Sequence, residues 1–182
     1  MVELMRPAAP TSFDIAIWFL DRARAEDTYV QPRMLQCLLF LAQAHYAAAH
    51  EGRPLMPAFF VVDDSGPLDP NVHKTLLNGR PDMEETPLDQ DVVQFLEAIW
   101  ARYKFTDALR LDQLIARKGA GEEAVAERDQ SEVTLHAMQR MFGAGGGAKS
   151  QNKIVGPTLA ETATGRKVTI TKWSPTRKKT AR

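Results

Sequence analysis

The clearest chemical signature in the sequence is the run Gly143–Ser150, which reads Gly-Ala-Gly-Gly-Gly-Ala-Lys-Ser. A phosphate-binding P-loop has the pattern Gly-x-x-x-x-Gly-Lys-Ser/Thr and surrounds phosphates with backbone N–H groups. Here Ala148 replaces the second glycine and adds a methyl group where the backbone must approach the phosphate. A P-loop also follows a strand and opens a helix, whereas this run follows a predicted helix and precedes a polar tail. The sequence therefore favours a linker over a nucleotide site.

The other candidates for chemistry are the single cysteine, Cys37, and the four histidines, His45, His50, His73 and His136. No two histidines stand three or four positions apart, the spacing that places two metal ligands on one helix face. Cys37 and His45 are more than two helical turns apart, which disfavours a nucleophile–base pair. We interpret Cys37 as a small buried hydrophobe and His45 as a core or edge histidine bonded to the backbone. We expect no cofactor, no metal and no enzymatic activity.

A cluster of acidic residues surrounds a predicted turn, with Asp63 and Asp64 before Ser65-Gly66-Pro67 and Asp69 after it. Carboxylates in a loop can bind a cation, but this spacing fits no calcium loop. Asp and Ser side chains bond their own backbone in turns, and Gly supplies positive φ. Two interpretations stay open: a plain turn, and a partner-contacting loop that consists of Asp63, Asp64, Ser65, Gly66 and Pro67, because loops on a rigid scaffold often carry recognition.

Helices must position these residues, because apolar side chains recur at helical spacing along most of the chain. The expected helices are Ser12–Asp27, Pro32–His50, Pro70–Leu77, Leu88–Tyr103, a helix capped by Thr106 that ends near Gly119, and Glu122–Phe142. Pro32–His50 has the widest apolar face, so we expect it to be the central helix. The predicted fold is an all-α, compact bundle of about five or six helices, with a short extended segment near residues 58–62, as strand or buried coil.

The first helix has a predicted start and a predicted buried face. Thr11 and Asp14 have the spacing of a capping box, in which a side chain at each position bonds the other's backbone. The predicted apolar stripe of this helix is Phe13, Ala16, Ile17, Leu20 and Ala23.

The net charge of zero hides an asymmetry between body and tail. Residues 1–142 hold 14 basic and 22 acidic residues, whereas residues 143–182 hold nine basic residues and one acidic residue. We therefore divide the chain into a disordered N-terminus (1–10), a helical domain (11–142), and a Gly-rich linker with a flexible basic tail (143–182). Segregation of this kind indicates contacts between the tail and a partner.

Several tail residues are candidates for partner binding. Residues 166–173 alternate and are rich in β-branched side chains, which predicts a strand or hairpin with Val168 and Ile170 on one side. Trp173 is of a residue type enriched at interface hot spots. The basic end includes Arg177, Lys178 and Lys179, for which a solvated terminus, an acidic protein partner and non-specific nucleic acid all stay open.

The chain lacks the signals of membrane or secreted proteins. No stretch approaches the roughly 20 apolar residues of a membrane helix, and the first ten residues lack the apolar core of a secretory signal. A single cysteine cannot form an internal disulfide. We therefore expect a cytoplasmic protein with no membrane partner.

The order of motifs between residues 12 and 142 resembles that of a known family. The motifs are Leu35–Gln43 (LQCLLFLAQ), His45-Tyr46, Gly52–Leu55 (GRPL), Gly66-Pro67-Leu68, Pro70–His73 (PNVH), Leu96–Tyr103 (LEAIWARY) and the Leu111–Ile115 segment. Together they are similar to the Panacea family of small bacterial antitoxins, the SocA-like antitoxins. Two features depart from the family pattern: Asp64-Ser65 stands where relatives have Lys-Tyr, and a His-x-x-x-x-Pro-Trp element is missing near residues 116–121.

The resemblance implies a role in a toxin–antitoxin system: an antitoxin that binds and neutralises a cognate protein toxin. The resemblance to SocA-like members also implies an adaptor role, in which the antitoxin presents the bound toxin to an ATP-dependent protease. The alternative from the residues themselves is a nucleic-acid-binding transcriptional regulator that uses the basic tail. Against it, the body is acidic and contains no clear helix-turn-helix with a basic recognition helix.

Overall fold

The computed structural model describes residues 5–83, 86–119, 132–143, 158–161 and 167–170. Within these residues the fold is mostly helical, which confirms the predicted fold class. The elements in chain order are α1 (Ser12–Ala25), α2 (Pro32–Ala49), β1 (Val61–Asp63), β2 (Gly66–Leu68), α3 (Pro70–Leu76), α4 (Gln90–Tyr103), α5 (Ala108–Arg117), α7 (Leu135–Phe142), β3 (Thr158–Glu161) and β4 (Lys167–Ile170).

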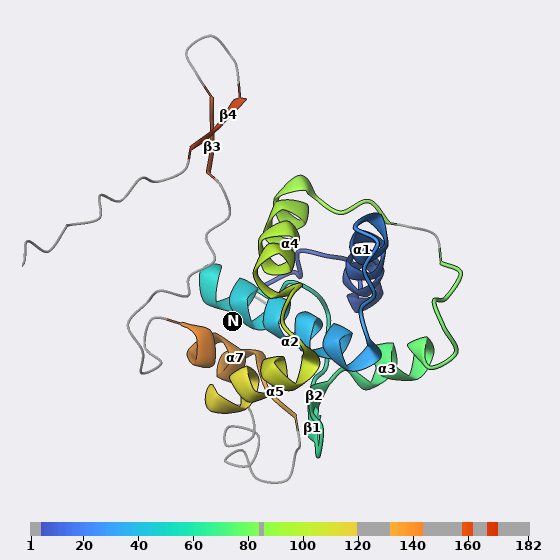
Figure 1. Ribbon diagram of the computed structural model, residues 1–182. Coiled ribbons are helices and arrows are strands. Elements are labelled where there is room, and N and C mark those ends of the chain that lie inside the picture. The colour runs from blue at the N-terminus through green and yellow to red at the C-terminus, as the bar shows by residue number, and fades with distance from the viewer. Residues whose placement is uncertain (1–4, 84–85, 120–131, 144–157, 162–166, 171–182) are drawn as a thin grey trace, which may run out of the picture.

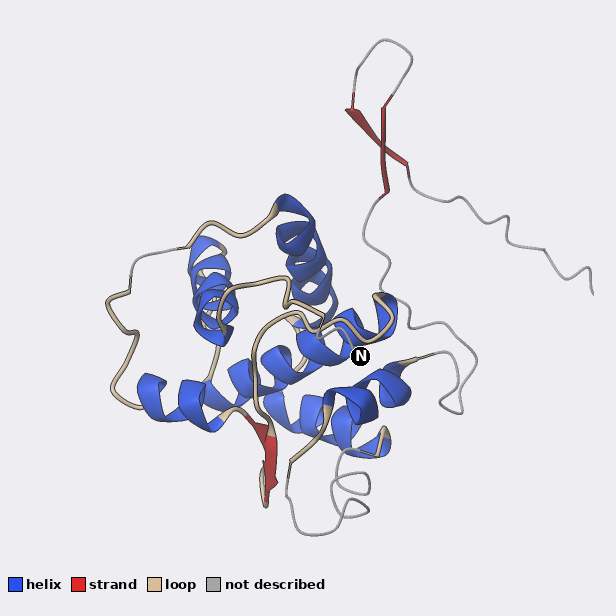
Figure 2. Cartoon of the chain, turned by 180° about the vertical axis from the view of Figure 1, so that it is seen from behind, coloured by secondary structure: helices blue, strands red, loops and turns tan. Residues whose placement is uncertain are grey.

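Helix α2 is the central element, as the sequence predicts. Pro32 stands in its first turn, where proline lacks only an N–H that would have no helical partner. Fourteen of its 18 residues are buried. Helices α1 and α4 lie on one side of α2, and α5 and α7 lie on the other (Figure 1). A view from behind shows the same arrangement (Figure 2). The core of the domain therefore surrounds α2 on nearly all sides.

Side-chain caps fix the starts of four described helices, α1, α3, α5 and α7. Thr11 and Asp14 form the predicted capping box of α1: Asp14 N–H donates to Thr11 Oγ1 at 3.1 Å, and Thr11 N–H donates to Asp14 Oδ2 at 3.0 Å. Asp69 Oδ1 accepts the Asn71 and Val72 N–H groups and caps α3. The predicted cap of α5 was one residue off: Asp107, not Thr106, accepts the Arg110 N–H. A carboxylate there also suits the positive end of the helix dipole.

The predicted helix Glu122–Phe142 is confirmed over Leu135–Phe142, which is α7, and is wrong over residues 132–134. Residues 132–134 are not helical: Glu132 bridges to Val61, and the Val133 N–H donates to the Phe60 carbonyl at 2.9 Å. Thr134 then caps α7 by accepting the Ala137 N–H. Two consecutive β-branched residues favour this extended entry. Residues 120–131 lie outside the described residues.

Two small antiparallel hairpins complete the fold. Strands β1 and β2 pair with Asp63 opposite Gly66, so only Asp64 and Ser65 form the loop. The predicted extended segment near 58–62 is thus partly a strand. Strands β3 and β4 pair from Thr158–Ile170 to Glu161–Lys167, which confirms a hairpin in the tail. Among the described residues, none of the helices combines the length and apolar character needed to cross a bilayer.

Candidate partner-binding site

The β1–β2 turn places three predicted binding residues at the surface. Asp63, Asp64 and Ser65 are exposed, Gly66 is half-buried and Pro67 is buried. The Ser65 N–H donates to Asp63 Oδ1 at 2.8 Å, the side-chain-to-backbone bond typical of Asp in turns. The turn interpretation of this segment therefore holds locally. It leaves the side chains of Asp63, Asp64 and Ser65 accessible to a partner.

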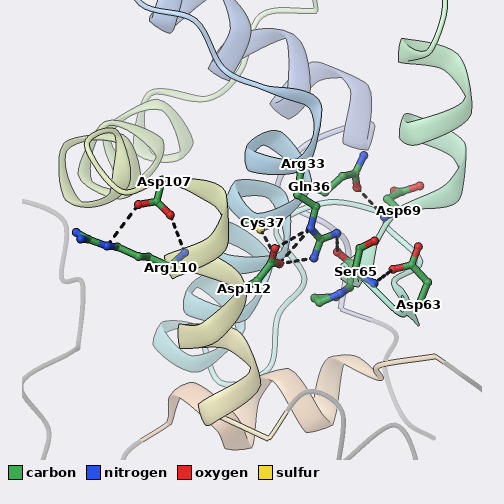
Figure 3. A network of polar contacts seen from close by, with 10 residues as sticks. Arg33, Gln36, Cys37, Asp63, Ser65, Asp69, Asp107, Arg110 and Asp112 are labelled. Carbon is green, nitrogen blue, oxygen red and sulfur yellow. Dashed lines mark hydrogen bonds and ion pairs between the residues drawn. The ribbon is translucent and has the colours of Figure 1, made fainter.

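Arg33, in the first turn of α2, fastens this turn to the helical body. Its Nη1 donates to the Pro67 carbonyl at 3.0 Å, and its Nε donates to both carboxylate oxygens of Asp112 at 3.1 Å. Its Nη2 also bonds Asp112 Oδ1. Figure 3 shows the guanidinium between β2 and α5. A planar guanidinium with several N–H donors is suited to bridging a carboxylate and a carbonyl at once.

Burial shapes the electrostatics of this cluster. Burial lowers the pKa of Arg33, but its hydrogen bond with Asp112 and nearby negative charges raise it by more, so the guanidinium stays charged. Cys37 lies beside the pair, and its thiol donates to Asp112 Oδ1 at 3.2 Å. Burial raises the pKa of Cys37 to about 12. The positive charge of Arg33 opposes this shift, and the hydrogen bond to Asp112 and the negative charge of Asp112 add to it. The thiol is therefore protonated and unsuited to nucleophilic chemistry.

A second contact from α2 secures the segment after the turn. Gln36 is 3% exposed, and its Oε1 accepts the Asp69 N–H at 2.8 Å. Asp69 in turn caps α3, so Gln36 links α2 to the start of that helix. Sequence reasoning missed Arg33, Gln36 and Asp112 as supporting residues. The available signal was the three-residue spacing of Arg33 and Gln36 on one helix face, but nothing local identified their partners.

A shallow cleft of about 310 Å³ lies between the turn and α5. Its lining includes Asp63, Asp64 and Ser65 from the hairpin, and Asp112 and Gln113 from α5. The cleft is acidic at its mouth, since Asp112 is already paired with Arg33 while Asp63 and Asp64 face outward. A basic segment of a partner fits this charge pattern.

Gly66→Ala is expected to destabilise the protein and loosen the turn. Gly66 has φ +109°, and a Cβ there would collide with Arg33 Nη2 and lie 3.1 Å from Asp112 Oδ1. Backbone strain alone costs about 1–3 kcal/mol in the free energy of unfolding, and displacement of Arg33 adds to it. Gly79→Ala is the matched control, because Gly79 has φ +93° but open space around its Cα. Urea titration of both variants measures the difference; equal losses would contradict a close packing of Gly66 on Arg33.

His45 was predicted to bond the backbone, but its partner is a side chain. His45 Nε2 and the Tyr103 hydroxyl are 2.8 Å apart, and the imidazole packs against the Phe142 ring at 4.6 Å between centroids. Burial, with smaller effects from the positive Arg102 and Lys118, lowers the pKa of His45 to about 3. The ring is therefore neutral and joins α2, α4 and α7. Among the described residues, no three His, Cys, Asp or Glu side chains gather to hold a metal.

Stability is expected to fall in mild acid because of His45. Its pKa is about 3 when folded and about 6.5 when unfolded, so the unfolded chain binds the extra proton. The stabilising contribution is complete above pH 6.5 and is lost as the pH falls from there toward 3. Between pH 7 and pH 5 this loss amounts to about 2 kcal/mol. Denaturant unfolding of the wild type and His45→Gln at both pH values measures it; parallel losses in the two proteins would contradict a buried neutral imidazole.

The predicted tail residues are only partly placed. Val168 and Ile170 belong to strand β4. Trp173, Arg177, Lys178 and Lys179 lie outside the described residues. The structure thus brings Asp63, Asp64 and Ser65 together at one turn, and contact between the tail candidates and a partner stays a prediction.

This chain matches no protein-family model, no curated protein and no solved structure.

Proposed function

We propose that this chain is an antitoxin that binds and neutralises a protein toxin through surface contact. The motif order over residues 12–142, similar to that of Panacea antitoxins, supports the class. The observation that carries the proposal is the exposed acidic turn Asp63–Ser65, held on the body by Arg33. A turn fixed in advance loses little conformational freedom on binding, so more of its contact energy contributes to affinity.

The negative charge of the turn indicates which side chains the partner presents to it. Asp63 and Asp64 are exposed and line the cleft, and residues 1–142 are acidic overall. Complementary charge accelerates encounter and disfavours wrong partners. The proposed toxin therefore presents Lys or Arg side chains to this turn.

The tail supplies a second contact in this proposal. A hairpin of two strands is marginal by itself in water, and each of its strands has one unpaired edge. Strands β3 and β4 pair with each other, and Figure 1 draws them clear of the helices. We propose that this hairpin extends a sheet of the toxin by strand addition. Presentation of the captured toxin to an ATP-dependent protease is the further step that the family resemblance implies.

Reversal of charge at the turn is expected to impair neutralisation. The double variant Asp63→Lys/Asp64→Lys should require about tenfold more antitoxin for rescue of growth, because like charges then meet at the interface. The assay co-expresses each variant with the product of a neighbouring gene that arrests growth when it is expressed alone. Asp82→Lys/Asp91→Lys, at two exposed positions elsewhere, is the matched control for net charge.

The same assay tests the tail. A chain that ends at residue 142 should keep the helical circular dichroism of the body and neutralise poorly. Full rescue by residues 1–142 would remove the tail from the mechanism. Full rescue by both the truncated chain and the turn variant would contradict the proposal that these surfaces bind the toxin.

Non-specific binding to nucleic acid is the second candidate, favoured by the nine basic residues after position 142. Affinity for random duplex DNA should then fall steeply with salt and vanish in the chain that ends at residue 142. Affinity that depends on DNA sequence and persists without the tail would instead indicate a regulator with a reading surface on the body.

A further inference from the structure

A groove of about 380 Å³ lies between α1, the start of α2, α3 and the loop that follows α3. Its apolar lining includes Leu20, Val30, Leu35 and Leu76. Tyr29 and Leu77 stand at its margin and are 78% and 68% exposed. Large apolar side chains this exposed contribute little to the fold where they are. Their position beside an apolar groove indicates a contact surface broader than an enclosed small-molecule pocket.

The groove also contains an unused hydrogen-bond donor. Gln36 is 97% buried and lines the groove. Its Oε1 must face the Asp69 N–H, which fixes the amide orientation. Nε2 then points away from Asp69, as Figure 3 shows, and it makes no hydrogen bond to any residue that the structure describes. Because this amide N–H group is open to the groove, an occupant of the groove can supply an acceptor oxygen for it.

The margin of the groove carries basic side chains, whereas the helical body as a whole is acidic. Arg24, in the last turn of α1, and His73, on α3, are both exposed at the groove. Arg24 forms no ion pair within the described part of the chain. Arg80 closes one end through an ion pair of 2.9 Å with Asp21. Residues 1–142 carry a net negative charge, so this local reversal of sign selects for carboxylates.

We propose that this groove binds an amphipathic helix of a partner protein that carries acidic side chains beside its apolar face. Apolar residues one turn apart would fill the space over Leu35 and Leu76 and cover Tyr29 and Leu77. A carboxylate would pair with Arg24, and a second acceptor oxygen would take the Gln36 Nε2 donor. The basic tail of this chain has the wrong charge for the site. The inference rests on the proposed function in that it gives a captured toxin, or a delivery partner, a second point of attachment.

A peptide selection tests the inference without any toxin. A displayed library of peptides about 18 residues long, five helical turns, is selected on the immobilised full-length chain. Enriched peptides should have apolar residues at i, i+3 or i+4, and i+7, with Asp or Glu beside them. Fluorescence anisotropy of a labelled selected peptide should show that it binds Leu77→Glu and Arg24→Glu about tenfold more weakly than the wild type. Exchange of the critical peptide acid for Lys should restore affinity for Arg24→Glu.

Matched variants separate local from general effects. Leu109 is 68% exposed, like Leu77, but lies on α5. Arg117 is exposed in the last turn of α5, as Arg24 is in the last turn of α1. Leu109→Glu and Arg117→Glu should therefore change affinity by less than about twofold. All four positions are exposed, so the variants should fold, and thermal melts check this.

Three results would overturn the inference. The first is a selection in which no acidic amphipathic peptide is enriched. The second is a selected peptide that binds Leu77→Glu and Arg24→Glu as tightly as it binds the wild type. The third is a dimer of the free chain that Leu77→Glu dissolves, which would assign the groove to a second copy. Peptide binding that passes these tests, combined with failure to rescue growth, would contradict the toxin proposal and leave the groove assignment intact.

Discussion

Leu38→Asp is expected to abolish cooperative folding of the helical body. Leu38 lies in the middle of α2 and is completely buried. The substitution removes an apolar side chain from the core, which costs about 2–5 kcal/mol. It also buries a carboxylate with no partner, which costs several kcal/mol more or forces its protonation. These losses approach or exceed the roughly 5–15 kcal/mol that holds a typical domain folded.

A thermal melt followed by circular dichroism at 222 nm measures this effect. The wild type should melt cooperatively, and the variant should show reduced helical signal with no sharp transition. Leu109→Asp is the control, because Leu109 is 68% exposed on α5 and should change the melting temperature little. An unchanged melt for Leu38→Asp would mean that α2 does not occupy the centre of the fold.

Gln43→Leu should be nearly as damaging, although it adds an apolar residue to a core. Gln43 is buried on α2, and its Oε1 accepts the N–H groups of Leu55 and Met56 at 3.0 and 3.1 Å. Its Nε2 donates to the Met56 carbonyl at 3.1 Å. Leucine satisfies none of these groups, so two buried N–H donors lose their partners at about 1–3 kcal/mol each.

Chemical denaturation measures the loss in free energy of unfolding. Gln113→Leu, at an exposed position on α5, should differ from the wild type by less than about 0.5 kcal/mol. A loss for Gln43→Leu as small as that of the control would contradict the assigned role of Gln43, which is to hold the 55–56 segment against α2.

The strongly periodic helices were predictable, because the residues that start each helix and define its buried face are close together in the sequence. Pro32 and the apolar run after it define α2, and the Thr11–Asp14 pair defines the start of α1. The predicted face of α1 was incomplete, because Ile15 and Phe19 are fully buried while Leu20 is not. A helix packed between two neighbours buries a wider arc than one stripe.

The supports of the candidate site were not predictable, because they join residues far apart in sequence. Arg33 pairs with Asp112, 79 positions away, and Gln36 meets Asp69, 33 positions away. A single sequence shows that such polar residues exist, but only the packing of α2 against α5 and the hairpin determines which of them meet. His45 shows the same limit, since its partner Tyr103 comes from α4.

The end of the body shows how local signals can mislead. Residues 122–142 have enough helical spacing to suggest one long helix. The pairing of Val133 with Phe60 and the Thr134 cap instead start a new helix at Leu135. The backbone hydrogen bond to Phe60 is a tertiary contact, and it overrides a helical preference that is weak at β-branched residues.

The central proposal is that this chain acts by direct contact with a protein toxin. Titration calorimetry of the purified full-length chain with the growth-arresting product of a neighbouring gene, at low and high salt, tests that proposal most directly. The account predicts a stoichiometric complex whose affinity falls with added salt, and about tenfold weaker binding for Asp63→Lys/Asp64→Lys. No heat of binding, or an affinity that neither salt nor the turn variant changes, would contradict it.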